Sequence, residues 1–130
     1  MKTTREHIGK SKEDYLEAIL VIRQEKGYCR SVDVCNHLNF TKPSVSRAVK
    51  SLEEEGYIER RDSGNIFLTE MGQAFAEKIL ERHVTITAIF ELLGVSPETA
   101  EDDACLIEHV LSDETYDKIR EWYEKNALKK

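Results

Sequence analysis

Three side chains that commonly bind transition metals stand close together in the segment ACLIEHVLS, residues 104–112. If this segment is helical, Cys105, Glu108 and His109 occupy positions i, i+3 and i+4 and share one narrow arc of the surface. A thiolate, a carboxylate and an imidazole on one face can bind a divalent transition metal together. Cys105 alone is equally well explained as a small buried hydrophobe. The segment is therefore a candidate metal site that needs further donors.

Further donors occur at two other places in the chain. Asp14 and Glu17 stand at i and i+3 beside the apolar stripe of a predicted helix, so both carboxylates could face one neighbour. His83 lies on the inward stripe of a long predicted helix, where an imidazole needs a partner. First-turn carboxylates favoured by the helix dipole and a hydrogen-bonded core histidine explain the same residues without a metal. The candidate metal set is Asp14, Glu17, His83, Cys105, Glu108 and His109.

Three predicted helices carry these donors, and a fourth follows them. The first spans residues 11–26, with Ser11 and Asp14 as its start signal, and Gly27 ends it. A long helix covers residues 69–93. Ser96 and Pro97 begin another that continues to residue 111, and Ser112 caps a final one. The carboxyl half is thus predicted to be entirely helical.

The segment between the first helix and the long helix has a different pattern. A short helix over residues 31–38, with Ser31 as cap and Val32, Cys35 and Leu38 inward, precedes a helix that begins at residues 41–43. The buried stripe of this second helix is Val45, Ala48, Val49 and Leu52. Short strands at 57–61 and 65–68 follow, separated by a turn of Asp62, Ser63 and Gly64. Two helices and a hairpin predict a winged helix-turn-helix.

The face opposite the buried stripe is positive and hydroxylated, as entry into the major groove of DNA requires. Arg47 can reach a guanine edge, and the arginines of the hairpin suit contact with the DNA backbone or minor groove. Singly, such charges are ordinary solvated positions on a helix. The predicted DNA-binding residues are Lys42, Pro43, Ser44, Ser46, Arg47, Lys50, Arg60 and Arg61.

Composition limits the class of protein. The chain has 130 residues, 40% hydrophobic and 34% charged, which is typical of a globular domain. The net charge of −6 excludes a polycation that binds nucleic acid nonspecifically over its whole surface, so DNA binding depends on a local patch of positive charge. Three cysteines without a CxxC pair argue against a disulfide framework, and no secretory signal or membrane span is found. We therefore expect a cytoplasmic, mainly α protein with a DNA-binding domain at residues 1–72 and a helical domain at 73–130.

The chain resembles the diphtheria toxin repressor family of metalloregulators, and especially its short branch of manganese transport regulators. The stretches that carry the resemblance are EDYLEAI, SVDVCNHLNFTKPSVSRAVKSLEEEGYIE, LTEMGQ, the RH that contains His83, and CLIEHVLSDE. The resemblance implies a homodimer paired through its carboxyl-half helices, in which metal promotes repression of uptake genes. The SH3-like third domain of longer members has no expected counterpart.

The resemblance also implies roles for the donors. Asp14 and Glu17 match the two carboxylates of the manganese branch, and His83, Glu108 and His109 match ligands of both branches. Cys105 departs from the manganese branch, which has glutamate there, and matches the iron branch. Thr87 and Glu101 depart from the second site of the iron branch, which has glutamate and histidine at these positions. The expected cofactor is Mn²⁺ or Fe²⁺, with Zn²⁺ or Co²⁺ possible in vitro.

The sequence therefore predicts a metal-dependent transcriptional regulator that binds operator DNA as a homodimer and is not an enzyme. An alternative is a winged-helix regulator that needs no metal and responds to a small ligand or to redox change at Cys105. A hydrolytic enzyme built on the His/Glu/Cys cluster is a third possibility, but the short helical half offers little room for a substrate cleft. Metal-stimulated DNA binding distinguishes the three.

Overall fold

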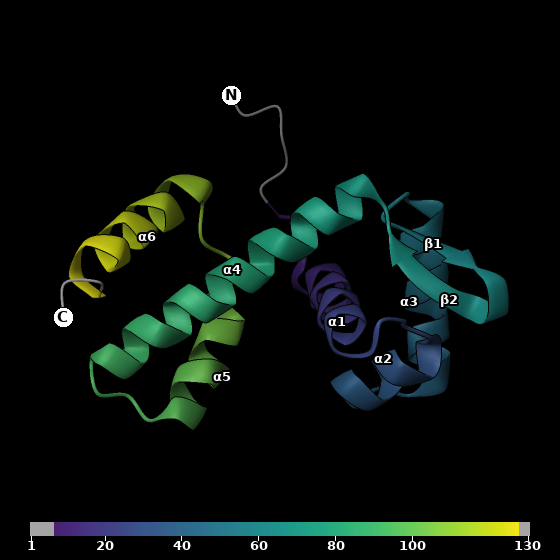
Figure 1. The fold of residues 1–130 in the computed structure, drawn as a ribbon, viewed down its shortest axis with the longest axis horizontal. Helices are drawn as coiled ribbons and strands as arrows, with labels where there is room; N and C mark the ends of the chain where they lie inside the picture. Colours follow the sequence, from purple (N-terminus) through teal and green to yellow (C-terminus); the bar gives the residue numbers. More distant parts are fainter. Residues whose placement is uncertain (1–6, 128–130) are drawn as a thin grey trace. The chain divides into compact units, whose positions relative to one another are not determined.

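The structure, a computed structural model, describes residues 7–127 of the chain (Figure 1). These residues form two compact units. The first contains residues 9–78, and the second contains residues 79–127 together with His7 and Ile8. The long helix α4 (Glu70–Leu92) contributes its first turns to one unit and the remainder to the other.

The first unit contains the winged helix-turn-helix. Its elements are α1 (Lys10–Lys26), α2 (Ser31–Leu38), α3 (Lys42–Glu54), β1 (Ile58–Arg61), the 3₁₀ turn η1 (Asp62–Gly64) and β2 (Asn65–Leu68). The two strands pair antiparallel, and α3 contacts both α2 and β1 (Figure 1). The predicted mainly helical fold with an amino-terminal winged unit is confirmed.

Helix α3 forms as its sequence predicts. The Thr41 side chain accepts a hydrogen bond from the Ser44 amide at 3.3 Å, and Pro43 occupies the first turn, where its missing N–H costs nothing. Val45, Val49 and Leu52 are buried, each at most 1% exposed. This spacing fixes which side of α3 faces the core and leaves the opposite side to solvent.

The predicted start of α1 and the predicted cap of α2 are each wrong by one residue, whereas the predicted range of α2, residues 31–38, is confirmed. Helix α1 begins at Lys10 after Gly9, whose φ of 109° suits glycine, and Ser11 provides no cap. Helix α2 is capped by Arg30 rather than Ser31, because the Asp33 carboxylate accepts from the Arg30 amide at 2.9 Å. Lys26 also donates to Asp33 at 2.9 Å, and this hydrogen bond lowers the pKa of Asp33.

The inward face of α2 also differs from the prediction. Val32 is 49% exposed, whereas Val34 is fully buried beside Cys35. Residues two positions apart in an α-helix point about 200° apart around the axis, so with Val34 buried, Val32 lies on the opposite, solvent side. Burial raises the pKa of Cys29 to about 12, which keeps this thiol protonated and supports a purely structural role.

A glycine in the first turn of α4 lets this helix pack closely against the chain just before β1. A Cβ at Gly72 would lie 2.0 Å from the carbonyl oxygen of Tyr57, so no other residue fits there without moving the backbone. The Thr69 amide donates to the same Tyr57 carbonyl at 3.1 Å. The start of α4 is thereby held against the base of the hairpin.

The second unit consists of the rest of α4, α5 (Pro97–Ile107) and α6 (Asp113–Ala127), with α5 and α6 on either side of α4 (Figure 1). The predicted caps are confirmed, because Ser96 accepts from the Thr99 amide at 3.4 Å and Ser112 from the Thr115 amide at 3.1 Å. The predicted end of α5 at residue 111 is wrong. The helix ends at Ile107, whose carbonyl accepts from the Val110 amide in a tighter turn.

Candidate metal centre and nucleic-acid interface

A buried carboxylate between two imidazoles lies in the second unit. The Glu108 side chain is 0% exposed, and its Oε2 lies 2.9 Å from Nδ1 of His83 on α4. Its other oxygen, Oε1, lies 3.3 Å from Nε2 of His109. Glu108 keeps helical backbone angles as the residue that caps α5, so the i, i+3, i+4 spacing survives the early end of the helix. The structure thus brings His83, Glu108 and His109 together.

Cys105 completes this cluster from one turn earlier on α5. One ligand atom from each of Cys105, Glu108 and His109 lies within 4.8 Å of the other two. Cys105 is half-buried. Four donors predicted from sequence therefore meet within this unit.

The cluster suits a divalent transition metal. Oε1 of Glu108 is fully buried and has no hydrogen-bond partner among the described residues. Burying an unsatisfied carboxylate oxygen is costly, whereas a cation at this position would satisfy it. The thiolate and imidazoles suit iron, cobalt or zinc, and the carboxylate also suits manganese.

The remaining predicted donors, Asp14 and Glu17, belong to α1 in the first unit. Both are half-buried and stand one turn apart, beside the buried residues Tyr15 and Leu16. Lys10 pairs with the Asp14 carboxylate at 2.7 Å. Their participation in the metal site stays a prediction.

Sequence reasoning missed Arg82, the residue that precedes His83. Its side chain is 1% exposed, and it donates to the carbonyl oxygens of Glu108 at 3.3 Å and Leu111 at 2.6 Å. It also donates to Asp113 at 2.6 Å, so it ties the end of α5 to the start of α6. Its position three residues after Ile79 places it on the inward stripe of α4, and this spacing could have identified it as a buried arginine.

The predicted DNA-reading surface is an exposed face of α3. Ser44 is half-buried at its edge, and the others are exposed: Lys42, Pro43, Ser46, Arg47 and Lys50. No acidic side chain lies in the helix before Glu53, so the amino-terminal turns present only positive and neutral groups. Such a face can hold phosphates and place Arg47 against base edges.

The two arginines of the wing are already engaged with protein groups. Arg60 donates to Glu53 of α3 at 2.7 Å, and this hydrogen bond lowers the pKa of Glu53. Arg61 lies over the ring of Phe67 at 3.9 Å and pairs with Glu59. Both side chains are exposed, so they could bind phosphates after exchanging these partners. The Arg60 contact also fastens the wing to the reading helix.

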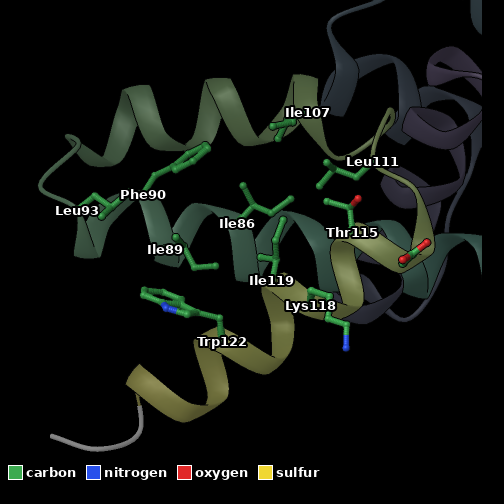
Figure 2. Close-up of a pocket in the computed structure, with 11 residues that line it drawn as sticks. Ile86, Ile89, Phe90, Leu93, Ile107, Leu111, Thr115, Lys118, Ile119 and Trp122 are labelled. Atoms are coloured by element: carbon green, nitrogen blue, oxygen red, sulfur yellow. The ribbon is translucent and has the colours of Figure 1, made fainter.

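An apolar groove of about 610 Å³ runs between α4, α5 and α6 of the second unit. Figure 2 shows side chains of all three helices facing it, with Trp122 and Ile119 of α6 opposite Ile89 and Phe90 of α4. Leu93, which also lines it, is 70% exposed, and Trp122 is 47% exposed. Exposed apolar surface of this kind marks an interaction site.

The fold and the two sites together define a class: a winged-helix DNA-binding unit joined to a helical metal-binding unit. Comparison with known proteins agrees with this class. Residues 7–64 match the family model described as the amino-terminal DNA-binding domain of the iron-dependent repressors. Residues 69–127 match the model described as their metal-binding and dimerisation domain. The chain belongs to the iron-dependent repressor family of metal-dependent transcriptional regulators.

Individual relatives support the same family. The transcriptional regulator MntR of Escherichia coli O157:H7 is 37% identical over 117 residues, which cover 90% of this chain and 76% of that protein. An uncharacterised HTH-type transcriptional regulator of Methanocaldococcus jannaschii is 36% identical, covering 91% of this chain and 96% of that one. The crystal structure of IdeR from T. acidophilum matches with a TM-score of 0.74 at 25% identity, over 95% of this chain and 56% of that chain. No helix among residues 7–127 is long and apolar enough to cross a membrane.

Proposed function

We propose that this protein represses genes for manganese or iron uptake by binding operator DNA in the cytoplasm as a metal-loaded homodimer, and that it has no enzymatic activity. The observation that carries the proposal is the buried Glu108 carboxylate, held between two imidazoles with one oxygen unsatisfied. One solved structure of similar fold is described as the manganese regulator SloR. The exposed basic face of α3 supplies the surface for DNA.

The proposed switch depends on a connection between the two units. A divalent cation supplies the positive charge that lets several carboxylates and imidazoles share one site. His83, Cys105, Glu108 and His109 hold it in the second unit, and Asp14 and Glu17 of α1 contribute from the first. Joining α1 to the helical unit fixes the angle of the reading helix α3. Linkage then requires metal and DNA to strengthen each other's binding equally.

The proposed interface between subunits is the apolar groove of the second unit, which we call the α4–α6 groove. Its walls are mostly apolar, and the domain that contains it matches a model named for dimerisation. Covering the exposed Leu93 and Trp122 removes apolar surface from water, which favours association. A second copy of this chain is therefore its occupant, and each dimer presents two reading helices to DNA.

The function is tested by measuring binding to the DNA upstream of the gene itself. Fluorescence anisotropy, without oxygen, would compare the apoprotein with protein given Mn²⁺ or Fe²⁺. A coupling free energy of 1–3 kcal/mol is typical of such switches, so we expect metal to raise DNA affinity about 5- to 150-fold. Equal binding with and without metal would favour the regulator that responds to a ligand or to redox change.

Cys105 is expected to set the preference among metals. A thiolate favours Fe²⁺, Co²⁺ and Zn²⁺ over Mn²⁺. A carboxylate discriminates less strongly against Mn²⁺. Anaerobic titrations of Mn²⁺, Fe²⁺ and Zn²⁺ should therefore show Cys105→Glu moving the affinity order toward Mn²⁺. Cys105→Ala should weaken Fe²⁺ and Zn²⁺ most. The same affinity order in all three proteins would exclude Cys105 as a ligand, and the buried Cys35→Ala variant controls for loss of a thiol elsewhere.

A further inference from the structure

A histidine outside the metal site binds the end of the ligand-bearing segment. Nε2 of His7 lies 2.6 Å from the carbonyl oxygen of Leu111, two residues after His109. A carbonyl oxygen only accepts, so the ring nitrogen is the donor in this contact. Nη1 of the buried Arg82 donates to the same carbonyl at 2.6 Å. We call the hydrogen bond from His7 to Leu111, with Arg82 beside it, the His7 latch.

The His7 latch lies at a point where the chain passes between units. His7 and Ile8 group with the helical unit, whereas the chain from Gly9 onward groups with the DNA-binding unit. The chain crosses between the units again only within α4, after Lys78. The described residues therefore contain two covalent connections between the units, and His7 anchors one of them.

Covalent geometry carries the effect of this anchor to α1. Lys10 begins the helix only three residues after His7, so their Cα atoms can be at most about 11 Å apart. The Glu13 amide donates to the Gly9 carbonyl at 3.0 Å, which shows that the first helical turn follows immediately. Asp14 lies four residues into α1, about 6 Å further along its axis. A fixed His7 thus restricts where the carboxylates of α1 can lie.

We propose that His7 is a positioning residue that keeps α1 within reach of the metal ligands of the helical unit before metal binds. The inference rests on the proposed function, because Asp14 and Glu17 must be ligands for it to matter. Restricting α1 in the apoprotein lowers the entropy lost when these carboxylates bind the cation. His7 acts on metal affinity in this way without touching the metal.

Substituting His7 tests the proposal through metal affinity. His7→Ala should lower the affinity for Mn²⁺ about three- to tenfold, which corresponds to the net contribution of one hydrogen bond. His7→Gln should recover most of the loss, because its carboxamide nitrogen can donate to the same carbonyl. His37→Ala, which removes an exposed histidine of α2, should have no effect.

A double-mutant cycle separates positioning from a general structural role. In a variant that already carries Asp14→Ala and Glu17→Ala, adding His7→Ala should cause no further loss of Mn²⁺ affinity. An equal loss in both backgrounds would show that His7 does not act through α1, and would overturn the proposal. An unchanged affinity for His7→Ala in the otherwise native protein would overturn it as well.

A measurement on the apoprotein distinguishes failure of the latch from failure of the metal site. Amide hydrogen exchange at Glu13 and Asp14 should be about three- to tenfold faster in His7→Ala than in the native protein, because the anchor of α1 is lost. Equal exchange rates would exclude the latch whether or not the protein binds metal. If the native protein binds no Mn²⁺, Fe²⁺ or Zn²⁺, the proposed function fails and the positioning role fails with it, even where faster exchange shows that the latch exists.

Discussion

Replacing Glu108 with glutamine is expected to lower the affinity for Mn²⁺ and Fe²⁺ at least about 100-fold, because even outer partners of metal ligands often contribute 10- to 100-fold. The carboxylate is fully buried and lies between His83 and His109, so glutamine at this position removes the anionic oxygen donor that both imidazoles adjoin. Isothermal titration without oxygen measures the affinity. Metal-stimulated DNA binding should disappear in the same variant.

Stability measurements show whether this loss reflects misfolding. Without metal, Glu108→Gln should unfold at the same or a higher urea concentration, because it replaces a buried carboxyl group that has an unsatisfied oxygen. With metal at 100 times its dissociation constant, the native protein should gain about 2.7 kcal/mol, and the variant should gain nothing. Glu98→Gln, an exposed change in the first turn of α5, is the matched control. Metal affinity in Glu108→Gln within threefold of the native value would contradict the assigned site.

Replacing Ile119 with glutamate is expected to dissociate the dimer. The side chain lines the α4–α6 groove, and a carboxylate there would lose its hydration when a second subunit covers it (Figure 2). Because two reading heads on one dimer raise DNA affinity by avidity of 10²–10⁴, we expect DNA binding to fall at least about 100-fold. Sedimentation velocity over a range of concentrations measures the dissociation.

The control for this variant introduces the same carboxylate at a position outside the α4–α6 groove. Lys125→Glu adds a carboxylate to the same helix at an exposed site outside the groove, and it should remain dimeric. Trp122→Glu provides a second test, because Trp122 is already 47% exposed and tolerates a polar replacement in the monomer. If Ile119→Glu and Trp122→Glu are folded and dimeric, the interface lies elsewhere.

The DNA-binding unit was largely predictable from local sequence. Thr41 and Pro43 mark the start of α3, and the spacing of Val45, Val49 and Leu52 determines its buried side. The strand-forming residues on both sides of a turn that contains Gly64 predicted the hairpin equally clearly. Local signals were weaker for α2, where the predicted cap and the inward Val32 were both wrong. The Asp33 side chain, three residues after Arg30, accepts a hydrogen bond from the Arg30 amide and so makes Arg30 the cap.

The end of α5 required tertiary structure. Ser96 and Pro97 mark its start, but no residue in the sequence marks Ile107 as its end. Arg82 of α4 binds the carbonyl oxygens of Glu108 and Leu111, which follow this end of the helix. A contact between residues 26 positions apart has no local pattern.

The sequence by itself determined which residue types can bind a cation or DNA, and on which helix faces they lie. Periodicity and caps depend on neighbours within about four residues, and these are visible in the chain. Only the tertiary structure decided that Glu108 is buried between His83 and His109, that Arg60 is held by Glu53, and that His7 reaches Leu111. Apart from Glu108 and His109, which are neighbours in the sequence, these contacts join residues of different segments, and packing, rather than spacing along the chain, brings them together.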